Sequence, residues 1–441
     1  MSKVSKHISL SKKYNFPTSF KCINYKSSIL VIAVDSARWI VLKNQSQLNF
    51  FQKLLSCNIQ TALDNSDISY EDAQEVIMQI EARHLEETPI KRVSVDGDTI
   101  MHLYLTNGCN MKCPHCYMTA GKKESDELTT SEIKAIIENF SKVNSGVLTL
   151  SGGEVTLRDD FEDICLYAFN KGVSVDILTN GVLWTDELIN TIGRKAHRIQ
   201  ISIDGYSEEE NSKIRGRGNF KIALQIVHKL IEVGSNVEIA ITPVFDENIS
   251  KKIHNYVDFA KKLEKQYGKN IKVTFNGDLM DGRDLKLTDE HRKMYADAIQ
   301  QIMVLRYGKD ALDASFIGSL RENVIRDNCA YGNLTIASNG DVYLCAFIPS
   351  LNPIGNIRKM SFDSLMELSN KAKVKSIVDN LEPCNNCELK YICGGECRIH
   401  HFPELKKDIT KATNQCARRC SKEHKEMFYD LMLRLNHYFF K

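Results

Sequence analysis

The chain has 441 residues, of which 43% are hydrophobic and 26% charged, enough to bury a large core and to form two or three domains. Lysine and arginine total 58 against 56 acidic residues, and a net charge of +2 does not indicate the strongly basic surface that nucleic-acid binding requires. The first residues, MSKVSKHISLSKKY, are polar, and no uncharged run approaches the ~20 residues of a membrane span, so we expect a cytoplasmic protein that binds neither nucleic acid nor membrane.

The first predicted domain comprises residues 1–90. Two apolar runs, residues 29–34 and 38–42, are predicted strands joined by a tight turn. Two helical patterns follow: one has its apolar face within residues 48–55, and the other begins at Ser69, a residue type that caps helices. This order, a small sheet followed by helices, resembles a winged-helix module.

The second predicted domain, residues 91–285, alternates apolar strand-like runs with helical segments. The six runs are MHLYLT, VLTLSG, VDILTN, IQISID, VEIAIT and IKVTFN. One intervening helix has Ile133, Ile136, Ile137 and Phe140 on a single face. Alternation of this kind predicts parallel strands, and six units indicate an α/β fold, a partial (β/α)6 barrel of the TIM type. Such barrels carry their sites at the C-terminal ends of the strands.

The rest of the chain divides into residues 286–420 and a C-terminal helix, 421–441. The first part is helical at its start and then becomes rich in cysteine and glycine, which suits a domain organised by metal. The last helix has an apolar stripe that includes Phe428, Met432 and Leu435, which we interpret as packing against another element rather than as a membrane contact.

The chain contains fourteen cysteines. In a cytoplasmic protein they remain reduced, so metal binding is favoured over disulfides. Eleven of them fall in two groups, at residues 109–116 and 329–420. Cys22, Cys57 and Cys165 stand alone, and we expect them to be ordinary small buried residues.

The first group is the motif C-x3-C-x2-C, formed by Cys109, Cys113 and Cys116 directly after the first barrel strand. Three thiolates in one short loop can each hold one iron of a 4Fe-4S cluster, which leaves the fourth iron open for a cofactor. The alternative is a structural zinc site. Zinc takes four closed ligands, however, and His115, between the last two cysteines, is poorly placed to be the fourth.

With Tyr117 after the last cysteine, this motif resembles that of the radical S-adenosylmethionine (SAM) superfamily. At the end of the second strand, Gly152, Gly153 and Glu154 resemble the family's GGE motif. The resemblance implies that this backbone and the acid bind the amino group of the SAM methionine, and glycine allows the close approach. Val155 replaces the proline that often follows the motif.

Further strand ends carry residues that match SAM-binding positions of the family. Asn180 follows the third strand, Ser202 and Asp204 end the fourth, Arg215 lies in the segment after it, and Thr242 ends the fifth. By resemblance, Ser202 and Asp204 lie near the ribose and methionine groups, and Arg215 binds the methionine carboxylate.

The resemblance also implies the chemistry. The three-cysteine cluster is the catalytic element: it donates an electron to SAM, which releases methionine and a 5'-deoxyadenosyl radical that abstracts a hydrogen atom from the substrate. An external flavodoxin or ferredoxin supplies the electron. No catalytic acid or base is needed for that step.

The second group of cysteines resembles the SPASM domain, which carries auxiliary 4Fe-4S clusters in many radical SAM enzymes. By the family pattern, one auxiliary cluster is held by Cys384, Cys387, Cys393 and Cys416. A second, which brings the total to three clusters, is held by Cys329, Cys345 and Cys397. Its fourth iron is open, bound by Cys420, or bound by a group other than cysteine. Zinc remains an alternative for part of this region.

SPASM enzymes commonly modify peptides, and the first domain resembles the PqqD-like recognition domain of ribosomal peptide maturases, in which an extended leader adds a strand to the small sheet. We therefore expect a maturase that cross-links a leader-bearing precursor peptide through a carbon–carbon or thioether bond. The alternatives are a sulfatase-type maturase that forms formylglycine, and a non-catalytic iron-sulfur or zinc-binding protein.

Overall fold

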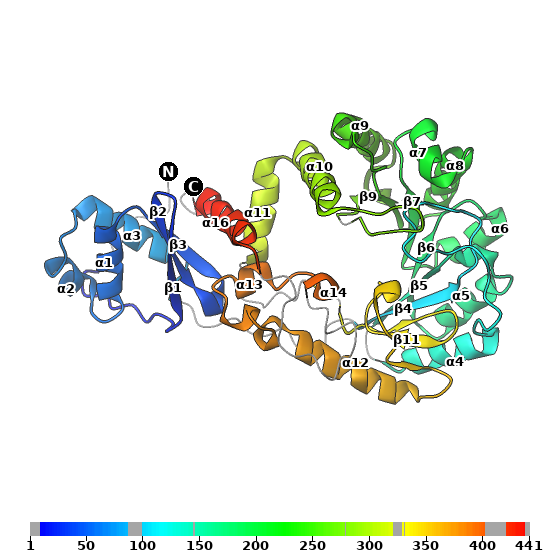
Figure 1. Ribbon diagram of the computed structural model, residues 1–441, viewed down its shortest axis with the longest axis horizontal. Coiled ribbons are helices and arrows are strands. Elements are labelled where there is room, and N and C mark those ends of the chain that lie inside the picture. The colour runs from blue at the N-terminus through cyan, green and yellow to red at the C-terminus, as the bar shows by residue number, and fades with distance from the viewer. Residues whose placement is uncertain are drawn as a thin grey trace. The chain divides into compact units, whose positions relative to one another are not determined.

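The computed structural model describes residues 9–86, 99–143, 146–277, 279–320, 329, 331–401 and 420–436 (Figure 1). The chain divides into two compact units. Unit 1 comprises Met1–Val95, Asp313–Ala330 and Val374–Lys441, and unit 2 comprises Asp96–Leu312 and Tyr331–Lys373. The division into four segments expected from the sequence stays a prediction. Within the described ranges, no helix is both long and apolar enough to cross a membrane.

Unit 1 begins with a three-stranded antiparallel sheet followed by three helices, the order expected from the sequence. The strands are β1 (Phe20–Tyr25), β2 (Ser28–Ala33) and β3 (Arg38–Leu42), and the helices are α1 (Gln45–Leu54), α2 (Ile59–Asp64) and α3 (Tyr70–Ala82). The Ser69 hydroxyl caps α3, as predicted, because it accepts a hydrogen bond from the amide of Asp72 at 3.1 Å. The sequence pattern misses β1, which mixes polar and apolar residues and exposes several of them.

Both faces of this sheet are covered. One face packs against α1, α2 and α3 through buried residues such as Val31. The other packs against α13 (Lys390–Cys393) and α16 (Lys422–Asn436), and there the indole Nε1 of Trp39 donates to the carbonyl of Met432 at 3.2 Å. Burial on both sides explains why β2 is apolar from Ile29 to Ala33 instead of alternating. The same core shows that the apolar stripe of the C-terminal helix packs against the small sheet.

The three single cysteines differ in burial. Cys165 is buried, as expected, and Cys57 is half-buried. Cys22 is exposed, so the prediction is wrong for this residue. The reason is that Cys22 lies on β1, a strand at the edge of the sheet.

Unit 2 is built on a nine-stranded sheet, of which six neighbouring strands are parallel and follow one another in chain order. They are β4 (Thr99–Thr106), β5 (Gly146–Gly152), β6 (Ser174–Thr179), β7 (Arg198–Ile203), β8 (Val237–Ile241) and β9 (Ile271–Phe275). All six correspond to the runs singled out in the sequence. Because the sheet is open, the α/β partial barrel is confirmed.

A short hairpin extends this sheet beyond β4. Strand β10 (Thr335–Ile336) pairs with β4 in parallel, and β11 (Asp341–Tyr343) and β12 (Gly355–Asn356) follow in antiparallel order. The sequence analysis does not predict that these strands join the barrel sheet, because strands of two or three residues carry no usable periodicity.

The long helices of unit 2 surround the outside of the sheet (Figure 1). They are α4 (Thr130–Phe140), α5 (Phe161–Asn170), α7 (Glu208–Arg215), α8 (Asn219–Glu232), α9 (Ile249–Tyr267) and α10 (Asp289–Tyr307), and a single turn, α6 (Asp186–Leu188), adds to them. Two helices, α11 (Lys309–Leu320) and α12 (Phe362–Ser376), begin in unit 2 and end in unit 1, which also contains α14 (Arg398–His401). The predicted stripe of α4 is buried, and a capping box of Thr129 and Glu132 begins the helix.

Candidate functional site

A cavity of about 520 Å³ lies at the C-terminal ends of the barrel strands. Its lining includes all three cysteines of the first group and seven of the nine residues expected to bind SAM: Cys109, Cys113, Cys116, Tyr117, Gly152, Gly153, Asn180, Ser202, Arg215 and Thr242. These residues come from the ends of five strands, so the barrel brings them together. The two others, Glu154 and Asp204, are fully buried and do not line the cavity.

The cluster loop, residues 107–121, is fixed where it leaves β4. The Glu127 carboxylate accepts hydrogen bonds from the hydroxyl of Thr106 at 2.9 Å and from the amide of Asn107 at 2.8 Å. The same Thr106 hydroxyl accepts a hydrogen bond from the amide of Gly108 at 2.9 Å. The backbone that leads to the first cysteine is therefore held by side chains as well as by the strand.

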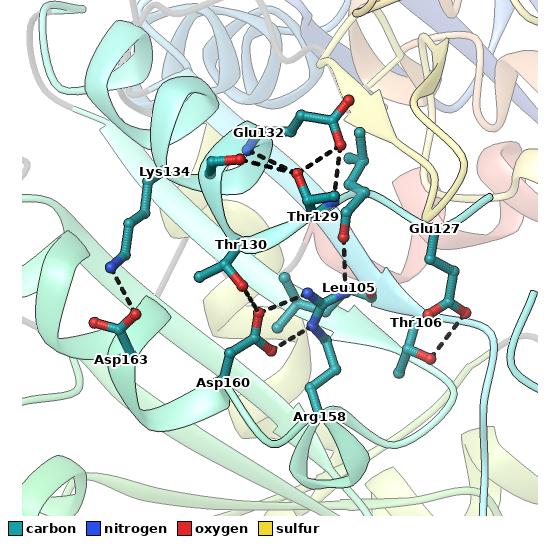
Figure 2. Close-up of polar contacts among 12 residues, drawn as sticks. Leu105, Thr106, Glu127, Thr129, Thr130, Glu132, Lys134, Arg158, Asp160 and Asp163 are labelled. Carbon is teal, nitrogen blue, oxygen red and sulfur yellow. Dashed lines mark hydrogen bonds and ion pairs between the residues drawn. The ribbon is translucent and has the colours of Figure 1, made fainter. Parts of the chain in front are cut away.

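A buried arginine also holds the end of β4, from which the cluster loop begins (Figure 2). The Arg158 guanidinium donates to the carbonyls of Leu105 and Leu128 at 2.9 and 3.0 Å and pairs with Asp160 at 2.7 Å. Asp160 also accepts a hydrogen bond from the hydroxyl of Thr130 at the start of α4. One ion pair thus ties the end of β4, the segment before α4 and the turn after β5 together.

Backbone hydrogen bonds hold the rest of the cluster loop. The amide of Cys109 donates to the carbonyl of Gly121 at 3.0 Å, which closes the loop on itself. The carbonyl of Cys116 accepts a hydrogen bond from the amide of Arg283 at 3.2 Å, so the segment after β9 also holds the loop. The three thiols are therefore presented by a backbone with little freedom to move.

Two glycines bring the turn after β5 into backbone contact with the cluster loop. A Cβ atom on Gly153 would lie 2.0 Å from the carbonyl oxygen of Gly108, and one on Gly152 would lie 2.4 Å from that of Thr106. Gly152 also has a φ of +130°, which other residues rarely adopt. These glycines therefore allow two loops to touch, in addition to the approach of SAM that the motif implies.

Glu154 joins the ends of two neighbouring strands. One carboxylate oxygen accepts hydrogen bonds from the hydroxyls of Thr156 and Thr179, both at 2.7 Å. The other accepts the amide hydrogen of Asn180 at 2.7 Å. Glu154 thus positions Asn180, which lines the cavity, and its own contact with the SAM amino group stays a prediction.

Arg215 is the positive charge beside the cluster cysteines. Its Nε lies 2.6 Å from Oδ2 of the buried Asp204, and the same oxygen lies 3.7 Å from Nε2 of His115. Burial raises the pKa of Cys113 to about 11, and the charge of Arg215 acts in the opposite direction. Iron is bound by thiolate, so Arg215 favours the protonation state that a cluster needs. The contact of Asp204 with SAM stays a prediction.

Several cavity residues are not singled out by the motifs. His115 lines the cavity from inside the cysteine motif, so its neighbours in the sequence could have revealed it. Phe347 gives no such signal: it belongs to the segment after β11 and packs edge-on against Tyr117 at 5.5 Å. The hydroxyl of Tyr104 lies 3.1 Å from that of Tyr117 and donates to the carbonyl of Ala346 at 2.6 Å. This segment thus forms part of the cavity wall.

Two sequence families match the chain where these motifs lie. The radical SAM superfamily matches residues 103–260, and the SPASM iron-sulfur cluster-binding domain matches residues 328–388. The chain contains a radical SAM domain and a SPASM domain. Its cofactors are SAM and 4Fe-4S clusters. The cavity fits them, because three thiols lie beside backbone, hydroxyl, amide and guanidinium groups that suit the methionine and ribose parts of SAM.

Four of the cysteines expected in the SPASM domain lie near one another in unit 1. Cys384 and Cys420 lie close enough to Cys393 for their charges to act on its thiol, and Cys420 acts on Cys387 in the same way. Four sulfur atoms are therefore available for one cluster. Cys416, which the family pattern assigns to this set, lies outside the described residues.

The cysteines expected to hold the other auxiliary cluster belong to different units. In unit 1 the amide of Arg398 donates to Sγ of Cys329 at 3.5 Å, which brings Cys329 beside the residue that follows Cys397. Cys345 belongs to unit 2. Their union in a single cluster stays a prediction.

Relatives of this chain include a maturase and a bacteriocin biosynthesis protein. The mycofactocin maturase MftC of Mycolicibacterium smegmatis is 27% identical over 70% of this chain and 80% of its own length. The antilisterial bacteriocin subtilosin biosynthesis protein AlbA of Bacillus subtilis is 27% identical over 66% of this chain and 65% of its own. The structure of Streptococcus suis SuiB bound to its precursor peptide SuiA covers 90% of this chain and 100% of its own at 14% identity, with a TM-score of 0.51, which shows a shared fold.

Proposed function

We propose that this protein is a maturase that installs an intramolecular cross-link, carbon–carbon or thioether, in a ribosomally made precursor peptide. The observation that carries the proposal is the presence, in one chain, of a radical SAM cavity, a SPASM domain and a small antiparallel sheet with an open edge. The names of MftC and AlbA and the precursor peptide bound to SuiB support it.

When bound, the cluster and SAM supply a 5'-deoxyadenosyl radical that removes a hydrogen atom from the peptide. The chain's own part is to bind and to orient. Cys109, Cys113 and Cys116 hold iron, and the charge of Arg215 favours the thiolate form of Cys109 and Cys113. The proposal includes an external reductant such as flavodoxin or ferredoxin, and a cytoplasmic location in which the thiols stay reduced.

The sheet of unit 1 is the proposed binding site of the leader. The outer edge of β3 is already bonded, because the side-chain amide of Gln79 exchanges hydrogen bonds of 2.8 and 2.7 Å with the backbone of Val41, and Arg83 donates to the carbonyl of Trp39 at 3.1 Å. The outer edge of β1 has no bonded partner among the described residues. Extended peptides bind by adding a strand to an open edge, so we assign the leader to β1.

The register of β1 identifies the amides that an added strand would use. The carbonyl of Ser19 accepts a hydrogen bond from the amide of Val34 at 2.9 Å, so Ile23, four residues further along, also bonds to β2. The amides of the alternate residues Cys22 and Asn24 therefore point away from β2. An added strand would meet them first.

Substitution of Cys22 tests this edge. Cys22→Pro removes an outward amide and leaves the bonds to β2 in place, since proline is tolerated where a strand's N–H faces solvent. We expect the leader-bearing peptide to bind at least about fivefold more weakly, the cost of one hydrogen bond, with SAM cleavage unchanged. Cys22→Ser, which keeps the amide, is the control. Equal affinities of the two variants in fluorescence anisotropy would place the leader elsewhere.

The proposed activity itself is tested by coexpression with the peptide encoded by a short reading frame beside the gene. A cross-link removes two hydrogens, so we expect a peptide that is lighter by that mass, resists fragmentation between the linked residues, and does not react with hydrazide. Cys113→Ala should leave the peptide unchanged. A product that reacts with hydrazide would carry an aldehyde and would support formylglycine formation instead.

A further inference from the structure

A histidine of unit 1 lies beside one of the cysteines expected to hold an auxiliary cluster. His424 lies in the first turn of α16, and its Nε2 is 3.6 Å from Sγ of Cys393 and 3.6 Å from a carboxylate oxygen of Glu396. The ligand atoms of these three side chains all lie within 4.8 Å of one another. The family pattern gives no role to His424, so its position beside a cluster cysteine calls for a physical explanation.

The imidazole is held in place by its own helix. The amide of His424 donates to the hydroxyl of Ser421 at 3.1 Å, which fixes the first turn of α16. The ring packs edge-on against Phe428, with the ring centroids 5.2 Å apart. One residue further along, Lys425 pairs with Glu388 at 2.8 Å and so binds the helix to the cysteine-rich segment. The direction of the imidazole is therefore set by packing and not by the cysteine alone.

The thiol is fixed by a different element. Cys393 ends α13, and its amide donates to the carbonyl of Leu389 at 2.8 Å. Leu389 and Ile392 are buried in the same core as the α16 residues Phe428 and Met432, against one face of the small sheet. Two elements that share one core thus bring the imidazole and the thiol together.

We propose that Nε2 of His424 donates a hydrogen bond to the Cys393 thiolate and so raises the reduction potential of the cluster that Cys393 holds. The reduced cluster carries one more negative charge than the oxidised cluster. An N–H group directed at a ligating sulfur stabilises that extra charge, because hydrogen bonds to the sulfurs are one of the means by which proteins set cluster potentials. The bond makes this cluster a better acceptor of an electron. The proposal depends on the iron-sulfur character of the SPASM domain and not on the identity of the substrate.

We assign the imidazole as a hydrogen-bond donor and not as a metal ligand, because cysteines already supply the four ligands that a 4Fe-4S cluster needs. Cys384, Cys387 and Cys420 lie around Cys393, so four thiolates are available for a 4Fe-4S cluster without His424. The separation of 3.6 Å suits an N–H to sulfur hydrogen bond. Two ligands of one tetrahedral zinc ion would also lie about 3.5 Å apart, from bond lengths of about 2.3 and 2.0 Å. The metal content therefore belongs to the test.

The experiment isolates this cluster in the full-length chain. Replacement of Cys109, Cys113, Cys116 and Cys345 by alanine removes ligands of the other two clusters and should leave about four irons per chain. In this background, His424→Phe removes the donor but keeps a ring against Phe428, whereas His424→Gln keeps an N–H group. The control is His228→Phe, because His228 is an exposed residue of α8 that pairs with Glu232.

The readout is the midpoint potential from a redox titration followed by electron paramagnetic resonance. We expect His424→Phe to have a more negative potential with iron content unchanged, His424→Gln to stay nearer the parent, and His228→Phe to match it. An unchanged potential in His424→Phe would overturn the proposal. Loss of iron from both His424 variants, with the circular dichroism spectrum retained, would make the imidazole a ligand, and zinc in place of iron would also overturn it. The redox titration contains no peptide, so its outcome is independent of the proposed maturase activity.

Discussion

Two glycines, one in the turn after β5 and one in the cluster loop, differ in the room that surrounds them. A Cβ atom on Gly153 would overlap the carbonyl of Gly108, whereas one on Gly121, in the same cluster loop, would lie 3.8 Å from its nearest neighbour, a guanidinium nitrogen of Arg283. The two positions therefore provide a matched pair in which the same substitution has different consequences for the cluster loop.

We expect Gly153→Ala to push the cluster loop away from the turn after β5, at a cost of about 3 kcal/mol in unfolding free energy. The displaced loop should lose its cluster, so that the protein binds about eight irons instead of about twelve. Gly121→Ala should keep both its stability and its iron. Urea unfolding and iron analysis after anaerobic reconstitution measure the two effects, and equal iron contents in the two variants would contradict this explanation of the GGE motif.

At the residue scale, the sequence predicts which residues gather but not which way each side chain points. The cysteines and the residues at five strand ends were identifiable because motif spacing and strand order are local properties. Glu154 was assigned to SAM, yet its carboxylate is directed at Thr179 and Asn180 on the neighbouring strand. The sequence does not contain that direction, since it depends on the packing of β5 against β6.

At the scale of elements, Arg158 joins three segments that approach the cluster loop (Figure 2). Its side chain is 7% exposed and is shared between a carboxylate and two carbonyl groups. Arg158→Met would leave all three acceptors without this donor, and we expect a loss of about 3 kcal/mol of unfolding free energy.

The control for this substitution is another ion pair of the same region. Lys134 pairs with Asp163 at 2.6 Å, but the two side chains are 29% and 59% exposed, so Lys134→Met should cost about 0–1 kcal/mol. Chemical denaturation of both variants tests the comparison. Similar losses would mean that burial of Arg158 contributes little.

Elements with a strong pattern were predictable and those without one were not. The six barrel strands are runs rich in apolar and β-branched residues, and each was found. β1 was missed because its exposed residues break the pattern, and β10 because a strand of two residues has none. The stripe of α16 was recognised, but an apolar stripe does not reveal the element that covers it.

At the scale of the whole molecule, the part of the chain that follows the six barrel strands contributes to both units. Residues 331–373 extend the barrel sheet, while α13 and α16 complete the core of the small N-terminal sheet. The sheet proposed to bind the leader and the cluster proposed to be tuned by His424 therefore share one core. Removal of the N-terminal strands would uncover α16, so substitutions such as Cys22→Pro test leader binding better than a deletion.

The central claim is that the radical formed in the cavity removes hydrogen from a peptide. The most direct measurement is the mass of the 5'-deoxyadenosine formed when the purified enzyme acts, without oxygen, on the precursor peptide made from fully deuterated amino acids. Radical abstraction predicts one deuterium in 5'-deoxyadenosine for each peptide that is cross-linked. A cross-linked peptide accompanied by 5'-deoxyadenosine without deuterium would contradict it.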